Sequence, residues 1–251
     1  MEEKMKIKNV ELKNQIVLAP MAGYTNLSYR KIMKEKGVGL VYSEMISAKG
    51  LVYENEKTFE LTKVDPNEHP ISMQIFGGDI ESLVLAAKII DKETDADIID
   101  INMGCPVKKV LKANAGSSLL KDPGFIYEMV NAVVCNVSKP VSVKIRAGID
   151  HSSINADKVA KAIEKAGASL IAVHGRTKSD LYRGNVNLDY IKLVKDSVSI
   201  PVIDIKSISD AERMFKYTNV DMIMVGRGSF GNPWLIRDLV DYFSGKPLQN
   251  P

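Results

Sequence analysis

The stretch Asp97-Ile-Ile-Asp-Ile-Asn-Met-Gly-Cys-Pro106 decides the fold, because a short apolar run leads there directly into a loop with glycine and proline. A run of this length, bounded by turn-forming residues, is typical of a buried strand. In α/β folds the chemically active residues lie just past the carboxyl ends of such strands. Cys105 is therefore predicted to lie on a loop at that end of the sheet.

Short β-branched runs alternate with amphipathic stretches along the rest of the chain. The candidate strands are eight, at 15–19, 40–44, 71–76, 97–102, 141–146, 170–174, 201–205 and 222–226. Helical periodicity is found between and after them, at 27–36, 81–92, 124–137, 154–166, 188–197, 207–217 and 233–242. Residues 47–65 are less regular, and we expect a long loop with a short helix there.

Strands that alternate with helices require parallel pairing through right-handed crossovers. Eight such units in 251 residues are the number needed to close a (β/α)8 TIM barrel. An open doubly wound sheet is the alternative, but Met21-Ala-Gly23 follows the first strand where that fold has a Gly-x-Gly-x-x-Gly loop. We expect one barrel domain over residues 1–240 and the start of a truncated extension over 241–251.

The composition is that of an ordinary soluble globular protein, with 45% hydrophobic and 26% charged residues and a net charge of +3. The longest apolar runs are about five residues, too short to cross a bilayer, and the N-terminus lacks a signal-peptide core. The second cysteine, Cys135, is interpreted as a small core residue on a helix, so a disulfide framework is not expected. We expect a cytoplasmic protein with reduced thiols.

If the strands form a barrel, the residues that follow them share one open end of it. Those residues are Pro20, Met21, Ala22, Gly23, Glu44, Met45, Gln74, Asn102, Cys105, Lys144, Arg146, His174, Gly175, Arg176, Asp204, Gly226, Arg227 and Gly228. The opposite ends carry residues of plain tight turns, such as Gly39, Pro70 and Pro140. This asymmetry predicts a functional site at the carboxyl end of the barrel.

Lys144 and Arg146 lie two residues apart on one predicted strand, so both side chains point to the same side of the sheet. A cation that points into the lumen needs an anionic or electron-rich partner, because burying it unpaired is costly. That partner is an anionic ligand or, structurally, a carboxylate such as Glu44 or Asp100. His174 at a strand end is either a satisfied core histidine or a ligand-binding residue, and its place beside Arg176 favours the second.

Residues 225–233 form the clearest candidate anion site, because three glycines let backbone amides approach a ligand and Pro233 is placed to open a helix. A glycine-rich turn without a ligand is the alternative, and Arg227 argues against it. Three scattered histidines and two distant cysteines give no metal-ligand spacing. Nucleophilic catalysis by Cys105 would need an aligned base such as His174.

Together these segments resemble the tRNA-dihydrouridine synthase family of flavoenzymes, from about Ile16 to Leu239. The matching stretches are Leu18-Ala-Pro-Met-Ala-Gly-Tyr-Thr-Asn26, Met73-Gln-Ile-Phe-Gly77, Asp100-Ile-Asn-Met-Gly-Cys-Pro-Val107, Asn114-Ala-Gly-Ser-Ser-Leu-Leu-Lys-Asp-Pro123, Val143-Lys-Ile-Arg146, Val173-His-Gly-Arg-Thr177, Val225-Gly-Arg-Gly228 and Gly231-Asn-Pro-Trp234. The resemblance implies an FMN enzyme that reduces uridine in tRNA to 5,6-dihydrouridine, with NADPH or NADH as the reductant.

The resemblance also implies roles for individual residues. Cys105 matches the acid that protonates carbon 5 of the uracil after hydride reaches carbon 6, so its thiol should start protonated. The flavin ring is expected at Pro20, Met21, Ala22 and Gln74, its reduced negative charge at Lys144, and its side chain and phosphate at His174, Gly226 and Arg227. We expect Asn102, Arg146 and Arg176 to contact the uracil and nearby nucleotide, which must be flipped out of the tRNA stack.

The chain departs from the family pattern in two places. After the seventh strand the family usually has Gly-Asn-Gly, whose amides help to hold the FMN phosphate, whereas Ile203 here runs straight into Asp204 and Ile205. Either FMN is held weakly or a short stretch is omitted. The family also usually continues into a helical C-terminal domain that grips tRNA, and we expect that domain to be largely absent.

Two other functions remain open from the sequence. One is an FMN barrel oxidoreductase that acts on a free pyrimidine, similar to dihydroorotate dehydrogenase. The other is a catalytically impaired RNA-binding barrel that has lost its phosphate-binding glycines.

Overall fold

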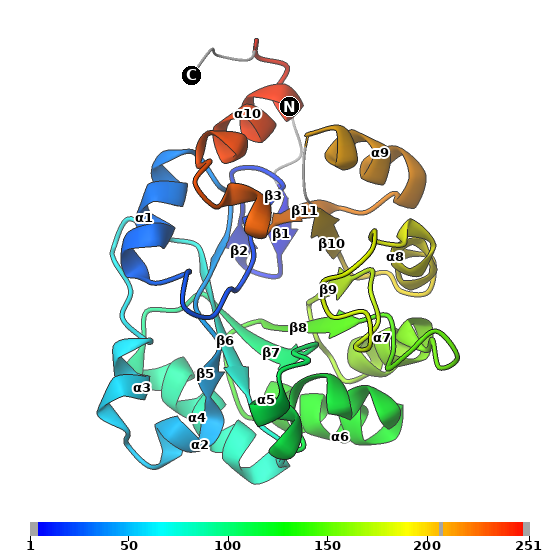
Figure 1. Ribbon diagram of the computed structural model, residues 1–251. Coiled ribbons are helices and arrows are strands. Elements are labelled where there is room, and N and C mark those ends of the chain that lie inside the picture. Colours follow the sequence, from blue (N-terminus) through cyan, green and yellow to red (C-terminus); the bar gives the residue numbers. More distant parts are fainter. Residues whose placement is uncertain (1–4, 206–207, 248–251) are drawn as a thin grey trace.

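The computed structural model describes residues 5–205 and 208–247, and its centre is a ring of eight parallel strands surrounded by helices (Figure 1). The strands are β3 (Ile16–Leu18), β4 (Val41–Tyr42), β6 (Ile71–Phe76), β7 (Ile98–Met103), β8 (Val141–Arg146), β9 (Leu170–His174), β10 (Val202–Ile205) and β11 (Met222–Val225). Each pairs with its neighbour in chain order, β11 pairs with β3, and a parallel bridge between Val17 and Leu40 closes the ring. The predicted (β/α)8 barrel is confirmed, and the open doubly wound sheet is excluded.

The helices follow the strands as the periodicity predicted. They are α1 (Leu27–Glu35), α4 (Ile80–Glu93), α6 (Pro123–Val134), α7 (Ala156–Lys165), α8 (Leu188–Lys195), α9 (Ile208–Thr218) and α10 (Trp234–Phe243). Capping side chains set several starts: Asn26, Asp79 and Asp122 each accept a hydrogen bond from a backbone N–H in the first turn. Pro123 occupies the first turn of α6, where the missing N–H carries no penalty.

Two apolar layers hold the barrel together. The outer layer lies between strands and helices and contains alternate strand residues such as Ile99, Ile101 and Val143. The inner layer fills the lumen and contains residues of the other parity, such as Ile98 and Leu170. This division follows from the period of two along a strand, because both faces of a barrel strand are covered.

An N-terminal hairpin closes the amino end of the lumen. Its strands are β1 (Lys6–Ile7) and β2 (Val10–Glu11), which pair in antiparallel fashion. Ile7, Val10 and Leu12 are buried and belong to the inner apolar layer. The lower half of the barrel is therefore a packed core, and the functional residues are left to the carboxyl end.

Several short elements were not predicted. They are β5 (Ile46–Ser47), α2 (Ala48–Val52), α3 (Glu56–Glu60), α5 (Lys108–Lys112), and the 3-10 helices η1 (Gly116–Lys121) and η2 (Arg227–Ser229). The loop predicted at 47–65 therefore contains two short helices instead of one. Each of these elements is six residues or fewer, too short for a helical or strand period to stand out.

The interpretation of Cys135 as a core residue is wrong. Helix α6 ends at Val134, and Cys135 is its exposed C-cap residue. The buried stripe of α6 runs through Ile126, Met129 and Val133, and a residue two positions beyond Val133 falls off that face. The thiol is free, as is that of Cys105.

Within residues 5–205 and 208–247, every helix is too short or too polar to traverse a lipid bilayer. Helix α10 runs past residue 240 to Phe243 and packs on the barrel through Ile236 and Leu239. The division of the chain at residue 240 stays a prediction.

Candidate active site

A cavity of about 480 Å³ opens at the carboxyl end of the barrel. It is lined by all twelve residues to which the family resemblance gave a role, namely Pro20, Met21, Ala22, Gln74, Asn102, Cys105, Lys144, Arg146, His174, Arg176, Gly226 and Arg227, whereas Gly23, Glu44 and Gly175 of the predicted mouth are not among its lining residues. The twelve residues come from six of the eight strands and their following loops. The structure therefore brings the predicted residues together, while the role of each stays a prediction.

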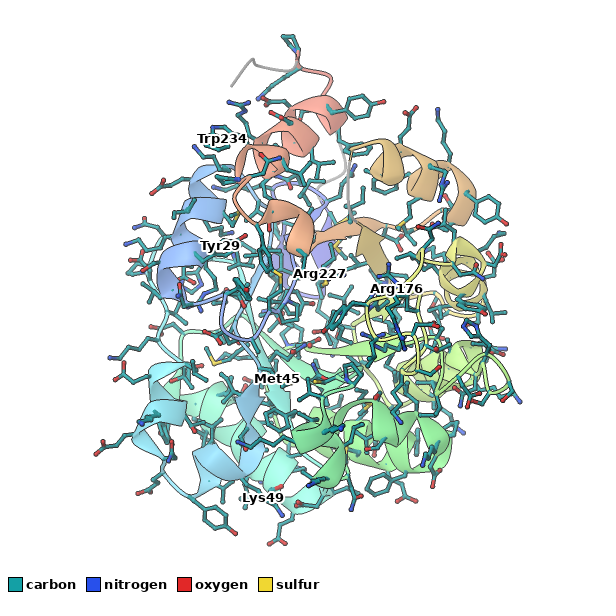
Figure 2. All side chains as sticks on the ribbon, viewed as in Figure 1. Tyr29, Met45, Lys49, Arg176, Arg227 and Trp234 are labelled. Atoms are coloured by element: carbon teal, nitrogen blue, oxygen red, sulfur yellow. The ribbon has the colours of Figure 1, made fainter. Side chains whose placement is uncertain are left out.

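Other lining residues were missed or went unassigned. They are Ala19, Tyr24, Met45, Gly104, Pro106, Val107, Tyr182, Val186, Met224, Gly228 and Phe230. Figure 2 shows Met45, Arg176 and Arg227 around the centre of the ring, whereas Lys49 and Trp234 lie at its outside. Tyr24 and Phe230 stack with ring centroids 4.1 Å apart and make one aromatic wall of the mouth.

The floor of the cavity is a row of amide side chains. Asn102 Nδ2 donates a hydrogen bond to Gln74 Oε1 at 2.9 Å. Asn102 Oδ1 accepts the backbone N–H groups of Gly104 at 3.2 Å and Cys105 at 3.0 Å. Both amides are almost fully buried, at 1% and 8% exposure for Gln74 and Asn102. Asn102, the second-last residue of β7, thus holds the backbone of the loop that carries Cys105.

The Cys105 loop is also fixed from its other side. Ser117 donates both its backbone N–H and its hydroxyl to the carbonyl oxygen of Cys105. Gly116 has φ +62, and a Cβ there would lie 2.7 Å from the same oxygen, so only glycine fits. The thiol itself is half-buried, and burial raises its pKa above the ordinary cysteine value against the opposing charges of Arg146 and Lys144. The thiol is therefore protonated at neutral pH.

Arg146 holds two loops of the mouth together. Its Nε donates to the carbonyl oxygen of Gly104 at 2.9 Å, and its Nη1 donates to those of Thr177 and Leu181 at 2.8 and 2.7 Å. The guanidinium is buried and satisfied by backbone oxygens, so this cation does not form the ion pair with Glu44 or Asp100 that the sequence left open. Glu44 instead accepts the N–H of Gly23. Burial raises the pKa of Asp100 to about 6, and the charge of Lys144 is one of the influences that oppose this rise.

Arg176 stiffens the loop after β9 in a similar way. Its Nε donates to Arg183 at 3.1 Å and its Nη2 to Gly184 at 2.6 Å, both at backbone oxygens. Its Nη1 lies 3.1 Å from His174 Nε2, and because arginine only donates, this ring nitrogen is the acceptor. Burial and the four surrounding cations hold the pKa of His174 well below its ordinary value, so the ring is neutral.

The loop after β9 supplies an aromatic side chain that sequence reasoning missed. The guanidinium of Arg227 lies 4.6 Å from the centroid of the Tyr182 ring, and that of Arg146 lies 5.4 Å from it. Tyr182 stands in an irregular segment with no strand end or motif beside it, so no local signal marked it. Its ring links the cations of β8 and η2 across the mouth.

The segment at 225–233 forms a turn and a helix start, as predicted. Residues Arg227–Ser229 form η2, and Pro233 is the N-cap residue of α10. The hydroxyls of Tyr29 and Ser229 lie 2.8 Å apart and tie α1 to this turn. The missing Gly-Asn-Gly was predicted between Ile203 and Asp204, which are consecutive residues of β10 (Val202–Ile205), and its effect on phosphate binding stays a prediction. Strand β10 continues through Ile205.

No group of three or more histidine, cysteine, aspartate or glutamate side chains that could hold a metal ion occurs in the part of the chain that the structure describes. His69 instead pairs with Asp97, and His151 with Asp180, each at 2.8 Å.

Comparison with known proteins places this site in a family. The chain matches the family model described as dihydrouridine synthase (Dus) over residues 17–250. It is 45% identical over 237 residues to tRNA-dihydrouridine synthase B of Pasteurella multocida (strain Pm70), an alignment that covers 93% of this chain and 71% of that protein.

Two further relatives agree. The chain is 41% identical over 251 residues to tRNA-dihydrouridine synthase B of Pseudomonas putida, covering 98% of this chain and 74% of the relative. It is 37% identical over 241 residues to a probable tRNA-dihydrouridine synthase of Rickettsia bellii, covering 95% and 74%. With a (β/α)8 barrel whose mouth gathers these motifs into one cavity, the chain belongs to the dihydrouridine synthase family.

Proposed function

We propose that this protein reduces uridine in tRNA to 5,6-dihydrouridine, with FMN bound in the barrel-mouth cavity and NADPH or NADH as the reductant. The observation that carries the proposal is the Cys105 thiol, which lies protonated in the same cavity as a cluster of cations. The family membership and the names of the relatives support the same reaction.

The walls of the cavity suit a flavin. Apolar side chains of Ala19, Met21 and Met224 offer a surface for a flat ring, and the buried amide of Gln74 offers polar contacts to its edge. Burial holds the pKa of His174 well below its ordinary value, and four cations lower it further, namely Lys144, Arg146, Arg176 and Arg227. This concentration of positive charge favours an anionic ligand. We assign the phosphate to Arg227 and the turn at Gly226, and the charge of the reduced ring to Lys144.

FMN supplies a hydride acceptor and donor, and the protein supplies the proton. Hydride is added to carbon 6 of the uracil, and the resulting negative charge is removed when Cys105 transfers its proton to carbon 5. The thiolate left behind lies near Arg146 and Lys144, whose charges stabilise it until it is reprotonated from solvent. A thiol of raised pKa suits this task, because an acid that is already ionised has no proton to give.

The uridine must leave the tRNA stack to reach the mouth of the cavity. Asn102 and the loops braced by Arg146 and Arg176 are the groups we assign to the uracil and the adjacent nucleotide. Since both guanidinium groups bond to backbone oxygens, we expect them to shape the mouth as well as to present charge.

The test is to incubate the purified protein with FMN, NADPH and an unmodified tRNA transcript, and to measure dihydrouridine by mass spectrometry of the nucleosides. Dihydrouridine in the tRNA is the expected result. Turnover of free pyrimidine with none on tRNA would instead establish a small-molecule oxidoreductase. Tight tRNA binding without any flavin binding would establish an RNA-binding barrel.

A further inference from the structure

We propose that Asp100 is a positioning residue: it fixes which way the amides of Gln74 and Asn102 face, and through them it holds the loop of Cys105. This inference rests on the proposed function for its kinetic consequence. Its structural content stands on the hydrogen bonds of the protein itself.

Asp100 is fully buried in the barrel lumen, directly beneath the cavity floor. Its Oδ2 accepts a hydrogen bond from Gln74 Nε2 at 2.6 Å, and its Oδ1 accepts one from the hydroxyl of Ser142 at 2.6 Å. The strand register explains this meeting, because Asp100 is the direct partner of Gln74 on β6 and of Ser142 on β8. All three side chains therefore point inward at one level of the barrel.

The carboxylate of Asp100 decides which atoms donate and which accept in the row of hydrogen bonds that runs through Gln74 and Asn102. An ionised aspartate only accepts hydrogen bonds, so Gln74 must turn its Nε2 toward Asp100 and its Oε1 toward Asn102. Asn102 must then donate its Nδ2 to Gln74 Oε1, which leaves its Oδ1 to accept the N–H groups of Gly104 and Cys105. If Gln74 turned over, Asn102 would present Nδ2 to those N–H groups, and two donors would face each other.

Keeping a carboxylate at this depth is costly, which indicates that its charge has a use. Burial raises the pKa of Asp100 to about 6, while Gln74, Ser142 and the charge of Lys144 oppose the rise. Among the described residues Tyr42 of β4 is a further titratable neighbour, and burial and the charge of Asp100 raise its pKa. Asp100 is thus ionised at neutral pH and begins to lose its charge just below it.

The test uses the FMN-free protein and measures amide hydrogen exchange at Gly104 and Cys105 by NMR. In Asp100→Asn the new amide can face either way, so the row loses its bias and exchange at Cys105 should rise about tenfold. Ser72→Ala is the matched control, because Ser72 is a buried lumen residue of β6 whose hydroxyl takes no part in the hydrogen bonds that join Asp100, Gln74 and Asn102. It should leave that exchange rate unchanged.

A second variant restores the row by moving the carboxylate one place along it. In Asp100→Asn with Gln74→Glu, the glutamate accepts from the amides at 100 and 102, and the asparagine at 100 still accepts from Ser142. Asn102 keeps its orientation, so protection of the Cys105 N–H should return. Unchanged exchange in Asp100→Asn, or no recovery in the double variant, would overturn the proposal.

The wild-type protein gives an independent reading that needs no substitution. After correction for intrinsic rates, exchange at Cys105 should rise as the pH falls below about 6, where Asp100 takes up its proton. A flat profile contradicts the proposal. None of these measurements uses FMN or tRNA. The positioning role of Asp100 is therefore tested independently of whether the protein forms dihydrouridine.

With FMN bound, Asp100→Asn should slow uridine reduction about tenfold at saturating tRNA, with little change in KM for tRNA. A role in folding alone predicts a lower Tm and a normal rate for the molecules that retain FMN. That result would also overturn the proposal.

Discussion

Arg146 Nε donates a hydrogen bond to the carbonyl oxygen of Gly104 at 2.9 Å, so strand β8 directly holds the loop that carries Cys105 on β7. The same guanidinium bonds to Thr177 and Leu181. One buried side chain therefore ties the loop of the proposed proton donor to the loop that follows β9.

Replacing Cys105 by alanine should separate the two halves of the proposed reaction. Reduction of bound FMN by NADPH should continue, whereas reduction of uridine should fall by about a hundredfold or more, because the proton donor is lost. Stopped-flow absorbance of the flavin measures both steps. Cys135→Ser is the matched control, since Cys135 is an exposed free thiol outside the cavity. Equal loss of both steps in Cys105→Ala would contradict a pure proton-donor role.

Replacing Lys144 by alanine should instead weaken the binding of the flavin or slow its reduction. We expect FMN affinity to fall about tenfold, or its reduction by NADPH to slow by a similar factor, because one cation of the cavity is removed. Quenching of flavin fluorescence measures the affinity. Lys112→Ala, on the exposed face of α5, should change neither quantity. If Lys144→Ala behaves like Lys112→Ala, the assignment of Lys144 to the reduced ring is wrong.

The pH dependence of uridine reduction should show an alkaline limb. The acid must carry its proton, so the rate falls as pH rises through the pKa of Cys105, which burial holds above its ordinary value. Arg146 lowers that pKa in the wild type, so Arg146→Ala should move the limb to higher pH. Single-turnover rates across the alkaline range test this. A limb that stays in place or moves to lower pH contradicts the assignment.

His174 should make the folded protein lose stability in acid. Its pKa is far below 6.5 in the folded chain and ordinary in the unfolded chain, so the unfolded state takes up the proton first as pH falls. The free energy of unfolding of the FMN-free protein should therefore drop more steeply between about pH 7 and about pH 5 than that of His174→Gln. The difference should reach about 2 kcal/mol. The free energies of unfolding are measured by urea denaturation at each pH. If they fall equally with pH in the wild type and in His174→Gln, the prediction is wrong.

The barrel and most of the site were predictable because both rest on local patterns. Runs such as residues 97–102 mark buried strands, and the residue after each strand falls at the mouth whatever the intervening length. Lys144, Arg146 and Asn102 were found in this way. Their partners were not, because a backbone oxygen such as that of Leu181 leaves no trace in the sequence.

The misses have the same physical origin. Tyr182 reaches the cavity only because a loop folds back over Arg227, and a loop without periodicity gives no direction for its side chains. Cys135 was misplaced because the helix was expected to continue to 137, whereas it ends at Val134. Element ends depend on caps and tertiary contacts, which a hydrophobic pattern does not contain.

The N-terminal hairpin also constrains the order of events in catalysis. With Ile7, Val10 and Leu12 packed into the amino end of the lumen, the nicotinamide and the uridine of the proposed reaction would both enter the cavity through its mouth at the carboxyl end. We expect them to bind there one at a time, with the oxidised nicotinamide leaving before the uridine enters. Double-reciprocal plots of the steady-state rate against tRNA, taken at several NADPH concentrations, should then be parallel, as in a ping-pong mechanism.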